Sequence, residues 1–187
     1  MKGLASLGGW LKHFGKPAPS SAAEERAAEL EDAESQFNKG QRFAGESGAA
    51  RNYSQAAEWY LKAAERDHSG AQFNLGLLYG KGQGVRRDEA AADMWLRKAA
   101  KSGHPEAQYH VGVRQHRASK SGRPPEASEC RIEALTWLLL AMAQGYRGAE
   151  PAREFVALEM TRDEVDEAER RAAAFQADET WVGAAPR

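Results

Sequence analysis

The only cysteine of this sequence, Cys130, is its strongest candidate for a nucleophile. A reactive thiolate needs a base within hydrogen-bond reach and cationic neighbours that lower its pKa, and the sequence around Cys130 shows neither. One cysteine also excludes an internal disulfide and every zinc site that needs several thiolates. We therefore expect a partly buried structural thiol and no catalytic residue, with a hydrolase that uses Cys130 kept as an alternative.

Three histidines follow one another at six-residue intervals, at His104, His110 and His116. Zinc ligands on a helix are typically four residues apart, because that spacing puts both side chains on one face. A six-residue interval does not do so, and we expect solvated or locally hydrogen-bonded histidines. The sequence predicts no metal site.

The glycine-rich stretch from Gly80 to Gly84 raises the question of phosphate binding. A phosphate-binding P-loop follows a strand and ends in Gly-Lys-Ser or Gly-Lys-Thr, and this stretch has neither feature. The chain has a formal net charge of -1 and no strong basic stripe, so it lacks the cations that nucleic acid binding requires. We expect no cofactor and no nucleic acid partner.

The composition favours an all-α fold. The chain has 187 residues, 42% of them apolar, which is enough for one sizeable core. Ala, Glu, Arg, Leu and Lys dominate and β-branched residues are sparse, so helix propensity is high along the whole chain. No run reaches the roughly 18 apolar residues of a membrane-spanning helix. We expect a soluble cytoplasmic protein, with a peripheral location at the inner face of the membrane as an alternative.

One short sequence segment occurs three times with a period of 36 residues. Ser-Gln-Phe-Asn-Lys-Gly at 35–40 recurs as Ala-Gln-Phe-Asn-Leu-Gly at 71–76 and as Ala-Gln-Tyr-His-Val-Gly at 107–112. A fixed period of this length is typical of repeat proteins in which each unit is one supersecondary element. The three segments therefore predict the first helices of three successive repeats, and a fourth first helix is expected from Ala149.

A second segment keeps the same register and has Ala, Trp and Ala at i, i+3 and i+7. Its first copy is Ala56, Trp59 and Ala63, its second is Ala92, Trp95 and Ala99, and its third, after a six-residue insertion near 119–128, is Ala134, Trp137 and Ala141. This spacing places the three side chains on one helical face, where alanines let a neighbouring helix approach and the tryptophan fills the gap. The segment predicts the second helix of each repeat.

Glycines at equivalent positions interrupt the predicted first helices, at Gly40, Gly76 and Gly112. A glycine inside a helix costs about 1 kcal/mol relative to alanine. Close packing of a neighbouring helix is the compensation that we expect at these positions.

The ends of the predicted helices carry capping residues. Asn52 and Asp88 are suited to cap the second helices of the first two repeats, and Cys130 falls at the equivalent position of the third. Gly103 and Gly145 follow second helices, where a residue with positive φ is common.

The second repeat carries the most specific pattern of the chain. It reads Ala71-x-x-x-Leu75-Gly76-x-x-Tyr79-x-x-Gly82-x-Gly84-Val85-x-x-Asp88, followed by Ala92, Trp95, Ala99, Ala100 and Gly103. This pattern resembles the Sel-1-like repeat of the tetratricopeptide-like superfamily. The first unit departs from it at Gly48-Ala49, and the third has an Arg/Ser/Pro-rich insertion in place of the glycine loop. The resemblance implies a short right-handed α-solenoid of helix-turn-helix repeats, and proteins of this family usually serve as adaptors that assemble complexes.

The chain divides into five expected segments. These are an N-terminal tail that is flexible or amphipathic (1–20), an acidic helical lead-in (21–34), three repeats (35–70, 71–106 and 107–148), capping helices (149–177) and a C-terminal tail (178–187). Thr161-x-x-Glu164 predicts a capping box that opens the last helix, whose apolar face is expected to cover the open end of the stack.

The N-terminal segment has two interpretations. Apolar residues and three lysines within residues 1–16 would form an amphipathic helix that binds a membrane surface or a partner. Four glycines in the same stretch penalise a helix and favour a tail without fixed structure. A membrane-peripheral scaffold that uses residues 1–16 is therefore an alternative function.

The candidates for a partner-binding groove are residues at equivalent positions of the three predicted first helices, most of them polar. The six candidates form two series, Asn38, Asn74 and His110, and Arg42, Leu78 and Arg114. By analogy with tetratricopeptide grooves, the first series would hydrogen-bond the backbone or terminal carboxylate of a peptide, and the arginines would pair with its acidic groups. The alternative is that Asn38 and Asn74 serve contacts between helices. The sequence thus favours a non-enzymatic adaptor whose partner is another protein or peptide.

Overall fold

The computed structural model of the chain describes residues 32–45, 51–123 and 125–177, all in one compact unit that begins at Asp32. Eight α-helices and no strands occur in this part of the chain, which confirms the all-α expectation. The helices are α2 (Ala33–Ala44), α3 (Tyr53–Ala64), α4 (Ser69–Lys81), α5 (Glu89–Lys101), α6 (Pro105–Ser119), α7 (Glu126–Ala143), α8 (Ala149–Ala157) and α9 (Arg162–Ala177). The expected tails at 1–20 and 178–187, residues 21–31 of the lead-in, and the stretch 1–16 considered for membranes lie outside the described residues.

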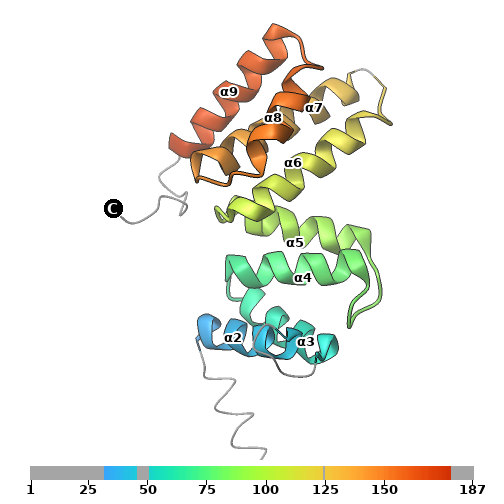
Figure 1. Cartoon of the computed structure of the whole chain (residues 1–187), viewed down its shortest axis with the longest axis vertical. Helices are drawn as coiled ribbons and strands as arrows, with labels where there is room; N and C mark the ends of the chain where they lie inside the picture. Colours follow the sequence, from blue (N-terminus) through green and yellow to red (C-terminus); the bar gives the residue numbers. More distant parts are fainter. Residues whose placement is uncertain (1–31, 46–50, 124, 178–187) are drawn as a thin grey trace, which may run out of the picture. The chain divides into compact units, whose positions relative to one another are not determined.

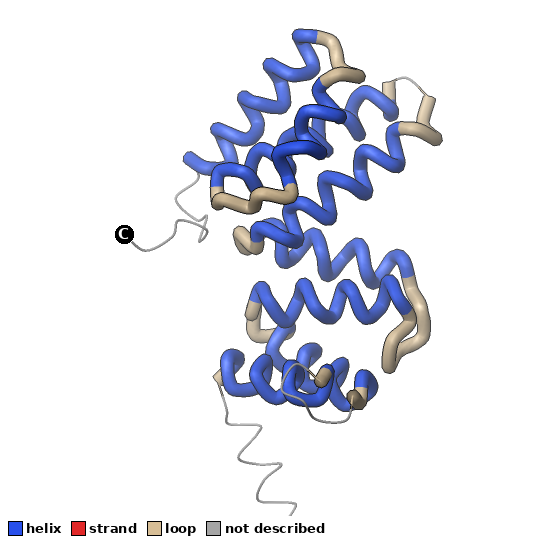
Figure 2. The backbone as a smooth tube through the Cα atoms, in the orientation of Figure 1, coloured by secondary structure: helices blue, strands red, loops and turns tan. Residues whose placement is uncertain are grey.

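Six of the helices form three pairs that follow one another along the chain, as Figures 1 and 2 show: α2 with α3, α4 with α5, and α6 with α7. Each pair packs on the next, through α3 on α4 and α5 on α6. Helices α8 and α9 both pack on α7 and close the last pair. The unit is a short α-solenoid of helix pairs with a C-terminal cap, as the sequence predicts.

Alanines make the close contacts between helices. The six alanines of the repeated Ala-Trp-Ala segment have no exposed surface: Ala56, Ala63, Ala92, Ala99, Ala134 and Ala141. Trp95 and Trp137 are also buried, whereas Trp59 of the first repeat is half-buried. The ammonium groups of Lys39 and Lys62 each lie 4.5 Å from the centroid of the Trp59 ring.

The glycines of the first helices lie against the residue that follows each tryptophan. A Cβ added to Gly76 would lie 2.9 Å from Cγ of Leu96, and one added to Gly112 would lie 2.9 Å from Cγ of Leu138. No real Cβ atom sits so close to a neighbour, so these positions need glycine. Close helix packing is therefore the compensation for the helix propensity that the glycines lose.

Buried glutamines tie each first helix to the end of the preceding second helix. The amide Nε2 of Gln72 donates to the carbonyl oxygen of Ala64, and that of Gln108 donates to the carbonyl oxygen of Ala100, both at 3.1 Å. These carbonyls lie at the C-terminal end of a helix, and each also accepts a hydrogen bond from the backbone N–H three residues later, that of Asp67 and that of Gly103. The glutamine of the repeated Ala-Gln motif thus links the first helix of one repeat to the end of the preceding repeat.

Histidines cap two of the first helices, a role that the sequence analysis did not assign. Nδ1 of His68 accepts a hydrogen bond from the backbone N–H of Ala71 at 3.1 Å, and Nδ1 of His104 accepts one from Ala107 at 3.3 Å. The His104 ring also stacks on Phe73, with the centroids 4.7 Å apart. The predicted caps of the second helices are confirmed, since Asn52 and Asp88 each accept a hydrogen bond from a backbone N–H three residues later.

The glycine loop of the second repeat packs on the first repeat. Gly84 has a φ of +70°, and a Cβ added to it would lie 2.2 Å from the backbone carbon of Tyr53. The hydroxyl of Ser54 donates to the carbonyl oxygen of Gly84 at 3.1 Å. The glycines of this loop therefore allow a close approach between backbones, which agrees with the repeat interpretation.

The insertion of the third repeat differs from the expectation for Cys130. Helix α7 begins at Glu126, so Cys130 lies within the helix and not at its cap. Pro125 precedes the helix, and Glu126 and Glu129 in its first turn interact favourably with the helix dipole. These residues start the helix four positions before the site inferred from the repeat register. The half-buried state of Cys130 agrees with a structural thiol.

Helix α9 opens with the predicted capping box. The backbone N–H of Thr161 donates to Oε2 of Glu164 at 2.8 Å, and the backbone N–H of Glu164 donates to Oγ1 of Thr161 at 3.3 Å. The Glu164 carboxylate also accepts hydrogen bonds from Ser128 and, at 2.7 Å, from Arg131 of α7. Burial raises the pKa of Glu164, but these hydrogen bonds outweigh it and lower the pKa to about 2.

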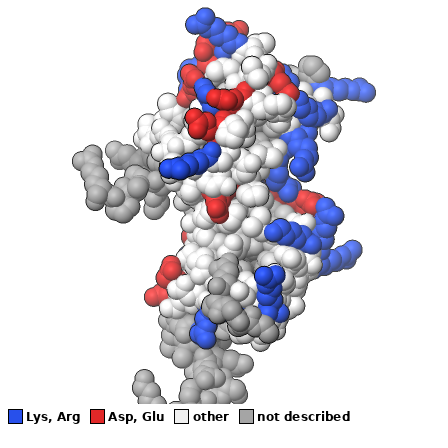
Figure 3. All heavy atoms as spheres, in the orientation of Figure 1, with Lys and Arg blue, Asp and Glu red and all other residues white. Residues whose placement is uncertain are grey.

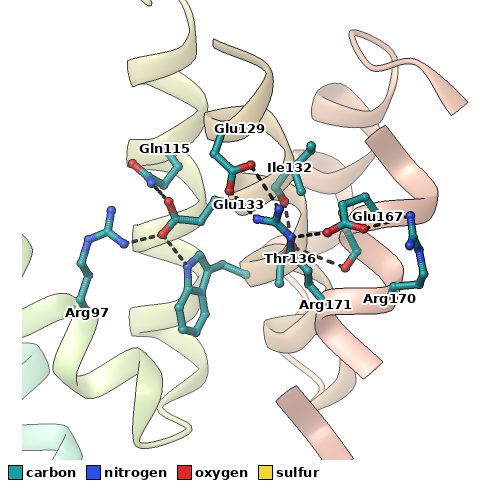
Figure 4. A network of polar contacts seen from close by, with 11 residues as sticks. Arg97, Gln115, Glu129, Ile132, Glu133, Thr136, Glu167, Arg170 and Arg171 are labelled. Carbon is teal, nitrogen blue, oxygen red and sulfur yellow. Dashed lines mark hydrogen bonds and ion pairs between the residues drawn. The ribbon is translucent and has the colours of Figure 1, made fainter. Parts of the chain in front are cut away.

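Polar contacts also join α7 to α9 along their length, as Figure 4 shows. The hydroxyl of Thr136 donates to the carbonyl oxygen of Ile132 at 2.8 Å and to that of Ala168 at 3.4 Å. The guanidinium of Arg171 in α9 pairs with the carboxylate of Glu129 in α7. The cap is held by buried hydrogen bonds as well as by its apolar face.

Candidate partner-binding site

The six residues of the predicted groove lie on the first helices of the three repeats, and the structure brings two of them together in a cleft. Asn38 and Arg42 are exposed on α2. The Asn38 amide donates to Glu34, one turn earlier on the same helix, at 3.4 Å. Arg42 has no ion pair within the described residues. Both side chains therefore face solvent, outside the cleft.

On α4, the two predicted groove residues, Asn74 and Leu78, differ in their exposure to solvent. Asn74 is half-buried and available at the surface. Leu78 is only 6% exposed and belongs to the core cluster that includes Ala56 and Tyr60. Leu78 therefore presents little of its side chain to a partner, because its apolar surface is used in packing the first two repeats together.

His110 and Arg114 of α6 line a cleft of about 240 Å³ between α4 and α6. Its apolar wall comes from Leu77, Leu96 and Val113 of three different helices. Gly76 and Gly80 of α4 also line the cleft, and a Cβ added to Gly80 would have one neighbour within 4 Å, Cβ of Ala92 at an ordinary 3.6 Å. An alanine at position 80 would therefore meet no clash.

Arg114 is already paired on one side of this cleft. Its guanidinium contacts the carboxylate of Glu89 at 3.1 Å and that of Asp93 at 3.4 Å, both on α5. Hydrogen bonds from Arg87 and then from Arg114 lower the pKa of Glu89. The charge of Arg114 is thus balanced, and its first role is to hold α6 against α5.

Asp93, one of the two acidic partners of Arg114, belongs to a network of ion pairs that extends to α7 in the third repeat. Asp93 also pairs with Arg97 at 2.8 Å, and Arg97 reaches Glu133 of α7. Figure 4 shows the Glu133 carboxylate between Arg97, the Gln115 amide and an indole N–H that belongs to Trp137. The network joins α5, α6 and α7 to one another. It therefore helps to position α5 and α6, which both line the cleft.

His110 has no hydrogen bond to its ring within the described residues, and it contacts Phe73 with ring centroids 5.5 Å apart. Burial lowers the pKa of His110; the charge of Glu106 opposes this shift, and the charges of Lys81 and Arg114 add to it. The imidazole is therefore neutral at neutral pH, with one donor and one acceptor nitrogen for a ligand.

Two cations that the sequence analysis did not single out complete the lining. Lys81 at the end of α4 and Arg117 near the end of α6 are exposed, and neither has an ion pair within the described residues. They are 36 residues apart, in the same register as Asn74 and His110. This spacing could have identified Lys81 and Arg117 as equivalent positions of two repeats, but Lys81 was interpreted as part of the glycine-rich stretch.

The loops beside the cleft add further positive charge. Arg86 in the α4–α5 loop and Arg123 in the α6–α7 loop are exposed and have no ion pair in the described part of the chain. Figure 3 shows Lys and Arg side chains gathered along the side of the molecule where these loops lie. We call the four unpaired cations Lys81, Arg86, Arg117 and Arg123 the basic edge.

Residues 32–45, 51–123 and 125–177 contain no cluster of three or more His, Cys, Asp or Glu side chains that could hold a metal ion. Over the same residues, no helix has both the length and the apolar character needed to cross a bilayer.

Helix-turn-helix units that stack through small residues and carry a cleft between successive first helices define a protein of the α-solenoid repeat class. The chain belongs to the Sel1 repeat family, which matches residues 33–68, 69–104 and 105–146. Sel1 repeats are typically protein-interaction modules, which agrees with the resemblance seen in the sequence.

The solved structures that are similar to the chain include two proteins with related repeats. The first is c5321, a protective antigen present in uropathogenic Escherichia coli strains that displays an SLR fold, with 28% identity and a TM-score of 0.68. The similarity covers 82% of this chain but 32% of c5321, so the chain spans about a third of that protein. The second is a Sel1 repeat protein from Oxalobacter formigenes, with 30% identity, a TM-score of 0.56, and coverage of 70% of this chain and 93% of the other. No curated protein matches the chain.

Proposed function

We propose that this chain is a non-enzymatic adaptor that binds a partner protein or peptide in the cleft between α4 and α6. The observation that carries the proposal is the lining of the cleft. Neutral His110, the paired Arg114, and Lys81 and Arg117, which have no ion pair among the described residues, line the cleft together with an apolar wall. Such a combination of apolar surface with a few oriented polar groups is typical of a binding site.

The location of the cleft supports an adaptor in a second way. Successive first helices of a solenoid form one continuous surface, so a peptide in the α4–α6 cleft would also reach Asn74 on α4. Toward the first repeat, the same surface continues to Asn38 and Arg42 on α2, which are exposed. Peptide binding along this surface would use five of the six predicted residues, with Leu78 acting through its packing.

Gly80 allows a direct test, because it lines the cleft and has room for a Cβ, so we expect a larger side chain at this position to extend into the cleft. We would capture partners from the native cell extract with the wild-type chain, with Gly80→Leu and with the matched control Gly80→Ala. The proposal predicts a partner that wild type and Gly80→Ala retain and Gly80→Leu loses.

Circular dichroism and unfolding curves would establish that all three chains are folded. Equal recovery of the partner by Gly80→Leu would show that the α4–α6 cleft is not the binding site, because leucine at this position leaves no room for a ligand side chain.

A further inference from the structure

We propose that the partner segment bound by the cleft is acidic and inserts one apolar side chain between α4 and α6. This inference rests on the proposed function and adds the chemistry of the ligand. It follows from the balance of charge around the cleft, which differs from the charge of the whole chain.

The lining of the cleft carries more positive than negative charge, with Lys81, Arg114 and Arg117 against Glu89. The carboxylate of Glu89 is the acidic group in the lining, and it is already shared between Arg87 and Arg114. Lys81 and Arg117 therefore remain without an acidic partner among the described residues. An anionic ligand would gain two ion pairs at the mouth of the cleft without breaking an existing one.

The basic edge extends this charge beyond the cleft. Arg86 and Arg123 lie in the loops that follow α4 and α6, so they flank the ends of the two helices that form the cleft walls. All four cations of the basic edge are exposed and unpaired within the described part of the chain. A segment with several carboxylates would meet them in succession as it leaves the cleft.

The apolar wall decides between classes of anionic partner. Leu77, Leu96 and Val113 offer apolar contact inside a cleft of about 240 Å³, which has room for a side chain. The flat surface of an anionic bilayer cannot reach this wall. A nucleic acid would present phosphates, whose binding requires many cations and gains little from the apolar contact. An acidic peptide with an apolar residue uses both features.

Neutral His110 fits the same ligand. Because burial keeps the imidazole uncharged, it would serve as a hydrogen-bond partner for the peptide backbone and not as a further ion pair. Lys81, Arg117 and the loop arginines would then supply the charge selectivity, while the cleft supplies selectivity for the apolar side chain.

The test uses the full chain and labelled peptides in fluorescence anisotropy. The first peptide carries a central leucine flanked by Asp and Glu, the second replaces every acid by its amide, and the third replaces leucine by serine. The proposal predicts that the first peptide binds, that binding weakens as salt is raised, and that both substituted peptides bind about tenfold more weakly or worse.

Matched variants locate the charge. Lys81→Glu with Arg117→Glu reverses the cations at the mouth, and Lys101→Glu with Arg147→Glu makes the same change of charge at exposed positions outside the cleft. We expect the first double variant to weaken binding of the acidic peptide by about tenfold or more and the second to change it by less than about twofold. Lys81→Gln with Arg117→Gln removes the charges without reversing them and should give a smaller loss.

Several results would overturn the inference. These are equal binding of the amide peptide, equal weakening by both charge-reversed pairs, no binding at about 1 mM peptide, or tighter binding of anionic vesicles or a single-stranded oligonucleotide that depends on Lys81 and Arg117. A captured partner that is lost by Gly80→Leu but retained by Lys81→Glu with Arg117→Glu would also overturn it while leaving the adaptor proposal intact.

Discussion

Gly76 of α4 lies directly against Leu96 of α5, so that a Cβ added to the glycine would be 2.9 Å from the leucine Cγ and 3.2 Å from its backbone nitrogen. Gly80, one turn later on the same helix, faces the cleft and would gain a Cβ at 3.6 Å from that of Ala92. Two glycines four residues apart thus have different reasons to be glycine.

The first prediction follows from this difference. Gly76→Ala should lower the free energy of unfolding by about 1–3 kcal/mol, because the added methyl group overpacks a buried contact. Gly80→Ala should raise it by up to about 1 kcal/mol, because alanine has the higher helix propensity and meets no obstacle. Urea unfolding of both variants measures the change, and equal destabilisation by the two would contradict the packing described for α4 and α5.

A second prediction concerns the histidine cap of α6. Burial lowers the pKa of His104 below its ordinary value of 6.5, so the unfolded chain takes up the proton first as the pH falls. The stability that this group contributes is fully present above about pH 6.5 and is lost as the pH falls toward its folded pKa.

His104→Asn isolates that effect, because asparagine also caps helices and does not titrate. We expect its stability at pH 7.5 to be near that of wild type and its loss of stability between pH 6.5 and 5 to be smaller. His104→Ala should lose about 1 kcal/mol at neutral pH. The measurement is the unfolding free energy across this range, and parallel pH profiles for wild type and His104→Asn would refute the assignment.

Glu164 provides a third prediction at more acidic pH. Its folded pKa of about 2 lies below its ordinary 4.5, so its stabilising contribution is complete above about pH 4.5 and disappears as the pH falls toward 2. Glu164→Gln keeps the shape of the capping box but removes the charge that Arg131 contacts.

We expect Glu164→Gln to lower the unfolding free energy by on the order of 2 kcal/mol at pH 7 and to flatten the pH dependence below 4.5. Thermal unfolding monitored by circular dichroism at several pH values would measure both effects. A variant with unchanged stability at pH 7 would show that the contacts between Glu164 and α7 contribute nothing.

A fourth prediction concerns the joint between the second and third repeats. Gln108 has no exposed surface, donates to the carbonyl oxygen of Ala100 and accepts from Nε2 of Gln144 at 2.7 Å. Gln108→Leu should lower the unfolding free energy by about 1–3 kcal/mol, because it removes the buried hydrogen bond to the Ala100 carbonyl oxygen and leaves the side-chain amide of Gln144 without its partner. Gln176→Leu on the exposed face of α9 is the matched control and should change stability little. Equal effects of the two substitutions would argue against a structural role for the buried glutamine.

Much of the fold was predictable because its determinants repeat. The period of 36 residues located the first helices, the Ala-Trp-Ala spacing located the second helices, and the capping box at Thr161 located α9. These are local signals that do not depend on the rest of the structure. The predicted start of α7 was wrong, because Pro125 and the acids after it begin the helix before Cys130. Pro125 lies in the insertion of the third repeat and has no counterpart in the first two repeats.

The candidate site was less accessible from the sequence. In-phase polar residues indicated His110 and Arg114, but the sequence could not show that Arg114 is already paired with Glu89, or that Leu78 is buried. Both facts depend on contacts between helices that lie far apart in the chain. Gly80 lines the cleft, but in sequence it looks like one more residue of a glycine loop.

Site-specific photo-crosslinking tests the central claim most directly. Benzoylphenylalanine would replace Val113, which lines the cleft, or Met94, an apolar residue of α5 that is 48% exposed and outside the cleft lining. Irradiation in native extract should then join the partner that wild type captures to the chain with the probe at 113 and not at 94. Crosslinking of that partner from position 94 alone would contradict binding between α4 and α6.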